Sequence, residues 1–182
     1  MIIAQEKRQS NIIEYLLYMW QIEDLIRSFD FDLEKIDKYV ISQFDVDQDT
    51  RNAMRSSYEN MIAAMKNEKV TVKGHLQVLK GVVKDLDELH LQLLRSPFHQ
   101  DYQQVFNNVM PYLTELFKKS SKDLEKSVVE LALEAMYGVW MLRLKKQPIS
   151  KQTEEAVNAM SDWLSLLAKK YHDREKQDDF LI

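Results

Sequence analysis

Residues 11–29 restrict the fold more than any other segment, because they are apolar around most of a helical circumference and yet contain three charged side chains. At 100° per residue, the side chains on one arc of this helix are Ile12, Leu16, Met19, Trp20, Glu23 and Arg27. The polar stripe is narrow, so other helices have to surround this one. Glu23 and Arg27 are therefore expected among apolar neighbours in a helical core.

The rest of the chain also has the composition of an all-helical protein. Three Gly and three Pro in 182 residues leave few residues for hairpin turns, and no stretch alternates cleanly between apolar and polar residues. No Ser/Gly/Pro-rich linker and no repeat of fixed period divides the chain. The sequence predicts an all-α single domain, residues 1–182, built as a bundle of six or seven helices that run mostly up and down. The first, fourth and sixth of these helices (residues 11–29, the helix ending near 95, and residues 121–146) are expected at its centre.

Capping residues predict where several helices begin. Asp47 or Asp49 can accept hydrogen bonds from the first turn of the helix that ends near residue 67, and Thr71 can do the same for the fourth helix. Pro97 suits the first position of the fifth helix, because its missing N–H has no partner there. The apolar face of that helix continues past Pro111, which predicts a kink in the helix and no break.

Charge and cysteine content exclude several classes of protein. The chain has no Cys, so it has neither disulfides nor thiolate chemistry, and this fits a reducing compartment such as the cytoplasm. The longest apolar run, residues 15–20, is far too short to span a bilayer, and the N-terminal stretch has no signal-peptide pattern. A net charge of −4 with both signs interspersed argues against nucleic acid as a partner. We therefore expect a cytoplasmic protein without membrane or nucleic-acid binding.

The charged side chains of the first helix are the strongest candidates for a site. The Arg27 guanidinium can reach the carboxylates of Glu23 and Asp24, which lie four and three residues before it. Three interpretations stay open: a buried ion pair that fixes the helix register, a ligand-binding cluster with Trp20 as a stacking wall, and a homo-oligomer interface.

His90 is the second candidate, because it occupies a core position in the fourth helix. It belongs to a heptad-like seam of apolar residues, namely Leu76, Leu79, Val83, Leu86, His90 and Leu93. A dinuclear carboxylate site needs two acid-x-x-His pairs, and Asp87 with His90 is the only one in the sequence. We expect a hydrogen-bonded core histidine, with neither metal nor cofactor. A single-metal site with Glu130 or Glu134 and an acid of the first helix is the alternative.

Other motifs carry little chemistry. Asp45, Asp47 and Asp49 imitate the start of a calcium loop, but Thr50 and Ser56 replace the Gly and Glu that such a loop requires. The sequence has no phosphate-binding loop, nucleophile pair or metalloprotease helix, so no catalytic residue is assigned.

Three sequence blocks resemble an uncharacterised family of all-helical proteins of about this length from Bacteroidetes: EYLLYMWQIEDLIR at residues 14–27, GHL at 74–76 and ELH at 88–90. The resemblance covers essentially the whole chain. It implies a bacterial intracellular protein with one helical domain, and it implies no activity.

The sequence thus favours a helical binding or assembly module, either a homo-oligomer or a protein-interaction protein, over an enzyme. The alternative is a small-molecule or metal-dependent enzyme whose pocket is lined by the first and fourth helices, near Trp20, Glu23, Arg27 and His90. The chain ends in the apolar residues 180–182, which could dock on the body of the protein or on a partner.

Overall fold

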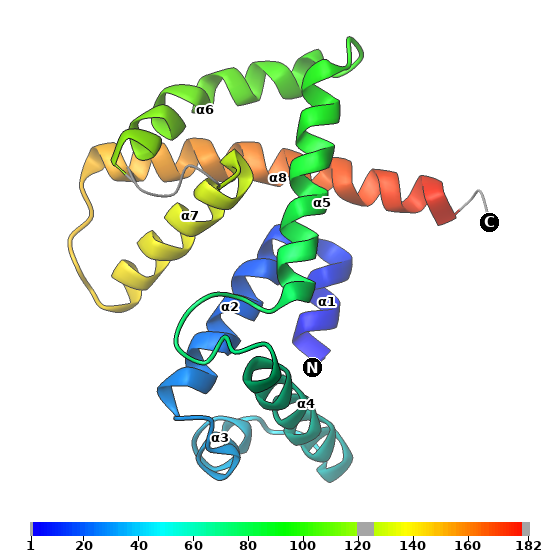
Figure 1. Cartoon of the computed structure of the whole chain (residues 1–182), viewed down its shortest axis with the longest axis vertical. Helices are drawn as coiled ribbons and strands as arrows, with labels where there is room; N and C mark the ends of the chain where they lie inside the picture. The colour runs from blue at the N-terminus through cyan, green and yellow to red at the C-terminus, as the bar shows by residue number, and fades with distance from the viewer. Residues whose placement is uncertain (1, 120–125, 180–182) are drawn as a thin grey trace. The chain divides into compact units, whose positions relative to one another are not determined.

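A computed structural model of the chain describes residues 2–119 and 126–179, and its regular elements are all helical (Figure 1). The elements are α1 (Ile2–Ser10), α2 (Ile12–Ser28), α3 (Leu33–Tyr39), the 3-10 turn η1 (Ile41–Gln43), α4 (Gln48–Asn67), α5 (Gln77–Arg95), α6 (Gln100–Lys119), α7 (Val128–Leu144) and α8 (Lys151–Asp179). The all-α prediction is confirmed. Residues 121–125 of the predicted sixth helix and the apolar end at 180–182 lie outside the described residues.

The described residues contain eight α-helices, so the expected number of six or seven is wrong by at least one. The additional helix is α1, which precedes the segment where the first helix was predicted. Asn11 separates the two helices, because its side-chain Oδ1 accepts a hydrogen bond from the Ile13 N–H at 3.0 Å and so caps α2. Nine residues were too few to show a periodic pattern of their own, although Ala4 is buried.

The chain divides into two compact units. The first consists of Met1–Ser10 and Glu14–Gly81, and the second of Asn11–Ile13 and Val82–Ile182. Most of α2 lies in the first unit, where Leu16, Met19, Trp20 and Glu23 of the predicted arc are buried. Arg27, the last residue of that arc, is only partly buried. Helix α3 packs on α4 in the same unit.

Ion pairs reinforce the contact between α3 and α4. Arg51 and Arg55 of α4 reach the two carboxylate oxygens of Asp37 at 3.1 and 3.2 Å, and Arg55 also pairs with Glu34. Two guanidinium groups thus share the carboxylates of one short helix, which holds α3 in place although it has only seven residues.

Three of the predicted helix starts can be compared with the structure. Asp47 caps α4 as expected, since its carboxylate accepts a hydrogen bond from the Thr50 N–H at 2.7 Å. Thr71 does not cap α5, which begins six residues later at Gln77. Helix α6 begins at Gln100, so the start predicted at Pro97 is wrong, and Phe98 is 88% exposed. The helix does continue through Pro111.

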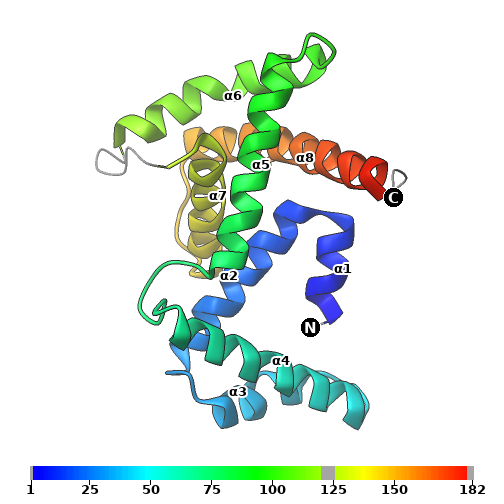
Figure 2. The same cartoon turned by 45° about the vertical axis from the view of Figure 1, so that its right-hand side comes forward.

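In the second unit, α6, α7 and α8 pack against one another in pairs, and α6 lies alongside α8 (Figures 1 and 2). Ser127 caps α7 by accepting a hydrogen bond from the Glu130 N–H at 3.1 Å. The buried residues of α7 lie mostly in its first half and are Val129, Leu131, Ala132, Leu133 and Val139. Its second half is more exposed, although the sequence there is equally apolar.

Candidate functional site

In the first unit, the carboxylate of Glu23 is fully buried and binds the start of α5. Its Oε1 accepts a hydrogen bond from the backbone N–H of Leu76 at 2.9 Å, and its Oε2 lies 2.5 Å from Nδ1 of His75. The Leu76 carbonyl accepts hydrogen bonds from Leu79 and Lys80, so Leu76 stands at the cap of α5. A side chain of α2 therefore supplies the cap, and its negative charge is favourable at a helix N-terminus.

The His75 ring is held by a stacking contact on one face and by a hydrogen bond at its edge. It stacks on the buried Trp20 ring with centroids 4.2 Å apart and an interplanar angle of 14°. A carboxylate only accepts hydrogen bonds, so the Nδ1 atom of His75 donates to Glu23. The His75 side chain is 26% exposed.

Arg27 holds the loop that leads into α5. Its guanidinium donates to the carbonyl oxygen of Val70 from Nε and Nη2, at 3.3 and 3.1 Å, and Nη2 also donates to the Gly74 carbonyl. Its Nη1 pairs with Asp24 at 2.7 Å. Gly74 has φ +86°, a left-handed conformation that glycine adopts without strain, so the loop can turn where Arg27 binds it.

The predicted partners of Arg27 are therefore half right. Arg27 pairs with Asp24, but the hydrogen bonds of Glu23 go to His75 and Leu76. Sequence reasoning missed His75, which lies 52 positions after Glu23 and carries no local signal for this contact. Trp20, Glu23 and Arg27 of α2 thus anchor the loop before α5 and the start of α5, and Asp24 pairs with Arg27. A role of these four side chains in binding a ligand or a second copy stays a prediction.

His90 belongs to the second unit and has partners of its own. Trp163 Nε1 donates to the Tyr102 hydroxyl at 2.8 Å, so the Tyr102 O–H donates onward to Nδ1 of His90 at 2.7 Å. The Phe106 ring packs edge-on against the imidazole at 4.5 Å. Burial lowers the pKa of His90 to about 4 and raises that of Tyr102. The expectation of a hydrogen-bonded core histidine is confirmed.

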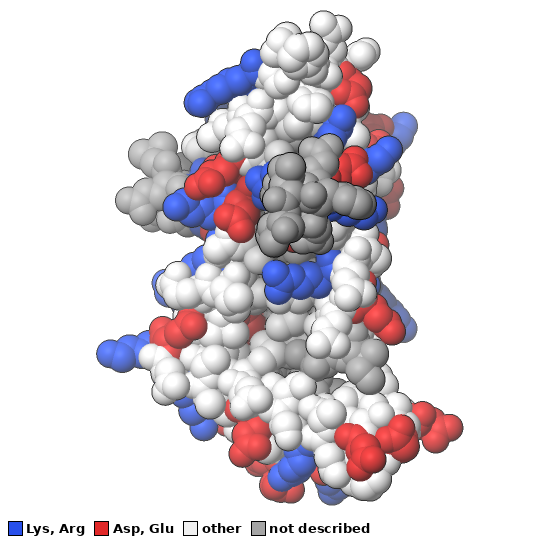
Figure 3. Space-filling view, turned by 90° about the vertical axis from the view of Figure 1, so that its right-hand side faces the viewer, with Lys and Arg blue, Asp and Glu red and all other residues white. Residues whose placement is uncertain are grey.

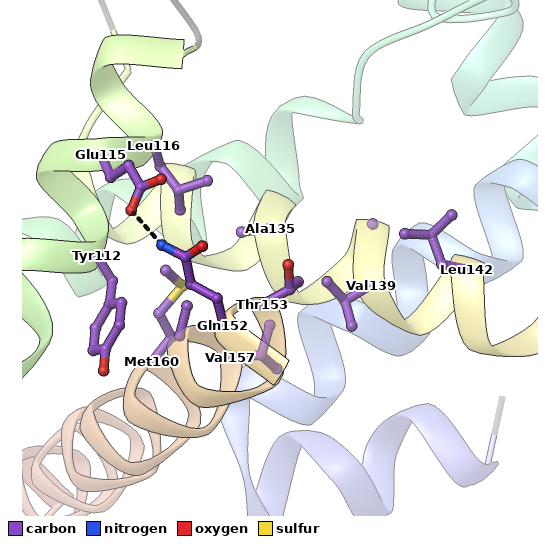
Figure 4. A pocket seen from close by; sticks show the side chains of 12 residues that line it. Tyr112, Glu115, Leu116, Ala135, Val139, Leu142, Gln152, Thr153, Val157 and Met160 are labelled. Carbon is purple, nitrogen blue, oxygen red and sulfur yellow. Dashed lines mark hydrogen bonds between the residues drawn. The ribbon is translucent and has the colours of Figure 1, made fainter. Parts of the chain in front are cut away.

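The described part of the second unit also contains an apolar groove that sequence reasoning did not find (Figure 4). Its volume is about 440 Å³, within the range of small-molecule pockets. Its lining comes from three helices: Tyr112, Glu115 and Leu116 of α6; Ala135, Gly138, Val139 and Leu142 of α7; and Gln152, Thr153, Ala156, Val157 and Met160 of α8.

The groove is polar at one end and apolar at the other. Gln152 donates a hydrogen bond to the Glu115 carboxylate at 3.3 Å, and Val139 and Leu142 lie away from this pair (Figure 4). Glu115 is the one charged side chain in the lining that the described residues form. The groove is thus suited to an apolar group that carries a cation or a hydrogen-bond donor.

Small residues leave this space unfilled. A Cβ atom added at Gly138 would meet nothing within 4 Å, and Ala135 lies one turn earlier on the same wall. The only hint in the sequence was the presence of three small residues, Ala132, Ala135 and Gly138, in a helix of otherwise larger and mostly apolar residues. Without the positions of α6 and α8, that hint does not identify a groove.

Over residues 1–178 the chain matches the family described as Domain of unknown function (DUF4924), and it belongs to that family. No curated protein and no solved structure matches the chain. Among the described helices, none is long and apolar enough to cross a membrane. Within the same residues, no group of three or more His, Asp or Glu side chains is placed to hold a metal ion.

Proposed function

We propose that this member of the DUF4924 family is a binding module, and that the groove between α6, α7 and α8 takes up an apolar segment of a protein partner. The observation behind this proposal is the groove itself, which has a volume of about 440 Å³ and predominantly apolar walls that include the exposed Leu142. Grooves between helices commonly receive an apolar helix face from a partner. Neither the described residues nor the comparisons support the alternative of an enzyme.

The groove can be tested with a neutral apolar dye whose fluorescence rises on burial, such as Nile red. Gly138→Phe should fill the groove, because the new side chain starts in open space on its wall. We expect dye binding at least about tenfold weaker than in the native protein, since the apolar contacts of the site are lost.

Gly81→Phe is the matched control. Gly81 also lies inside a helix with nothing within 4 Å of an added Cβ, but it is in α5 of the first unit. Both substitutions change helix propensity in the same way, so only the position differs. Equal dye binding by the two variants would contradict the proposal.

The cellular setting belongs to the same proposal. A chain without Cys fits a reducing bacterial cytoplasm. On the face drawn in Figure 3, acidic and basic side chains are interspersed, and the net charge of −4 likewise disfavours nucleic acid as the partner. Measuring retention on a heparin column at low salt would test the absence of nucleic-acid binding.

We also propose that the chain folds as one domain, a helical bundle with α2, α5 and α7 at its centre. Helix α5 supports this, because Gln77–Gly81 belongs to the first unit and Val82–Arg95 to the second. Helix α2 likewise contributes residues to both units. A single unfolding transition, coincident by circular dichroism and tryptophan fluorescence, is expected. Two separated transitions would show that the units fold independently.

A further inference from the structure

The four histidines of the chain differ in how their ring nitrogens are used. Nδ1 of His75 donates its hydrogen to the Glu23 carboxylate, so in the neutral ring the lone pair lies on Nε2. No described residue forms a hydrogen bond with this Nε2, and the atom is not enclosed, since the side chain is partly exposed. His75 therefore presents to solvent a nucleophilic nitrogen whose tautomer is set by a buried carboxylate.

None of the other histidines combines these features. Nδ1 of His90 accepts a hydrogen bond from a tyrosine hydroxyl in a buried position, so its Nε2 carries the hydrogen and has no lone pair. Nδ1 of His99 lies 3.5 Å from a lysine ammonium, which likewise assigns the hydrogen to Nε2. His172 has a glutamate carboxylate 3.2 Å from Nδ1, but its Nε2 is buried. These three histidines serve as internal comparisons for His75.

The ring of His75 is also held in a fixed orientation. Its face stacks on the Trp20 ring and its edge is bound by Glu23, so both contacts come from the same helix, α2. The loop before it is held by Arg27, which donates to the carbonyl oxygen of Gly74. An imidazole fixed in this way needs little reorganisation before its Nε2 attacks an electrophile.

The chain around His75 is basic, although the protein as a whole has a net charge of −4. Residues 69–81 contain three exposed lysines, Lys69, Lys73 and Lys80, and neither Asp nor Glu. The two glutamate carboxylates that reach the start of α5 from elsewhere are engaged by its backbone N–H groups. His75 lies two residues before α5, and a helix N-terminus favours negative charge. These charges favour an anionic electrophile, such as a phosphoryl donor, at Nε2.

We infer that His75 is a phosphorylation site, at which Nε2 accepts a phosphoryl group from a small donor of the phosphoramidate or acyl phosphate class. With phosphoramidate, the Nε2 lone pair attacks phosphorus, the N–P bond of the product forms, and the P–N bond of the donor breaks. The protonated nitrogen of the donor leaves as ammonia with the electron pair of that bond. An acyl phosphate releases a carboxylate in the same manner.

Glu23 is a positioning residue for this step. The phosphorylated ring keeps its Nδ1 hydrogen and carries a positive charge, which the buried Glu23 carboxylate balances across the 2.5 Å hydrogen bond. No proton has to leave the ring during the transfer, so no separate base is required. The product adds negative charge to residues 69–81, whose only other charged side chains are lysines.

The test is the reaction of the folded full chain with potassium phosphoramidate, followed by site mapping with mass spectrometry under conditions that preserve the N–P bond. His75 should react at least about tenfold faster than His99 or His172, because only its Nε2 has both a lone pair and access to solvent. In the urea-unfolded chain the histidines should react at similar rates, since the fold no longer sets their tautomers and exposure. Similar rates in the folded chain would overturn the inference.

Glu23→Gln tests the tautomer. Its amide oxygen can still accept from the Leu76 N–H, but its NH₂ group then donates to Nδ1 of His75, which moves the ring hydrogen to Nε2. The rate at His75 should fall at least about tenfold, as expected for a histidine held in the wrong tautomer. Glu14→Gln changes an exposed acid of the same helix and should leave the rate unchanged. An unchanged rate in Glu23→Gln that is folded by circular dichroism would overturn the assigned step.

Two histidine variants test the site independently of Glu23. His75→Gln should lose the fast reaction, whereas His99→Gln, which changes another partly exposed histidine, should keep it. Phosphorus NMR of the native product should show the isomer phosphorylated at Nε2. A fast reaction that persists in His75→Gln, or a native product phosphorylated at Nδ1 of His75, would overturn the inference.

Discussion

Replacing Glu23 with Ala is the sharpest test of the anchoring role of α2. The change removes the fully buried carboxylate that accepts hydrogen bonds from the Leu76 N–H and from Nδ1 of the partly exposed His75. Losing a helix cap costs about 1 kcal/mol, and losing a charge-assisted hydrogen bond costs about 1.5–3 kcal/mol. We expect a decrease of roughly 2.5–4 kcal/mol in the free energy of unfolding.

Two further variants of α2 make the test specific. Glu23→Gln keeps an oxygen that can accept from the Leu76 N–H but places an amide toward His75, so its cost should lie between zero and that of Glu23→Ala. Glu14→Ala removes an exposed carboxylate of the same helix that pairs with Lys7, and should cost no more than about 1 kcal/mol.

The assay is urea unfolding followed by circular dichroism, together with native-state hydrogen exchange at the amides of Leu76 and Gln77. If Glu23→Ala weakens the anchor, exchange at these two amides should accelerate more than exchange in the middle of α5. A decrease in the free energy of unfolding below about 1 kcal/mol, equal to that for Glu14→Ala, would contradict the capping role of Glu23 at the start of α5.

Three other outcomes follow from the second unit. Tyr102→Phe leaves the buried Trp163 Nε1 and His90 Nδ1 without their shared partner, so urea unfolding should show a loss of about 2–4 kcal/mol, whereas Tyr112→Phe in the groove should change little. Burial lowers the pKa of His90 from 6.5 to about 4, so the unfolded chain takes up a proton at a higher pH than the folded chain does. The contribution of His90 to the free energy of unfolding should therefore be fully present above about pH 6.5 and decrease progressively toward pH 4. Unfolding measured across this window should show a flatter profile for His90→Gln, and an unchanged profile would assign the acid sensitivity to other groups. Ser127→Ala should lower the free energy of unfolding by about 1 kcal/mol through loss of the α7 cap, and no change by calorimetry would show that α7 does not depend on it.

The sequence predicted the helices well where the signal is local. The apolar arc of α2 is buried, the seam of α5 is buried including His90, and Asp47 caps α4, because periodicity and capping depend on residues within a few positions of each other. The start of α5 was misplaced, since its caps come from Glu23 of α2 and from Glu68, whose carboxylate accepts a hydrogen bond from the Gln77 N–H at 2.7 Å.

Local patterns in the amino-acid sequence predict that this chain is helical and which faces of α2 and α5 are apolar. They also indicate that Glu23 needs a polar partner in its buried position, because an unpaired charge there costs several kcal/mol. The identity of that partner, His75, depends on the three-dimensional packing, since any donor that the fold brings near a carboxylate can satisfy it. The groove likewise depends on tertiary packing, because small residues such as Gly138 leave a cavity only where α6 and α8 enclose the space beside them. Local periodicity therefore set which helix faces are apolar. Long-range packing set which groups hydrogen-bond to a buried carboxylate and where small residues leave a groove.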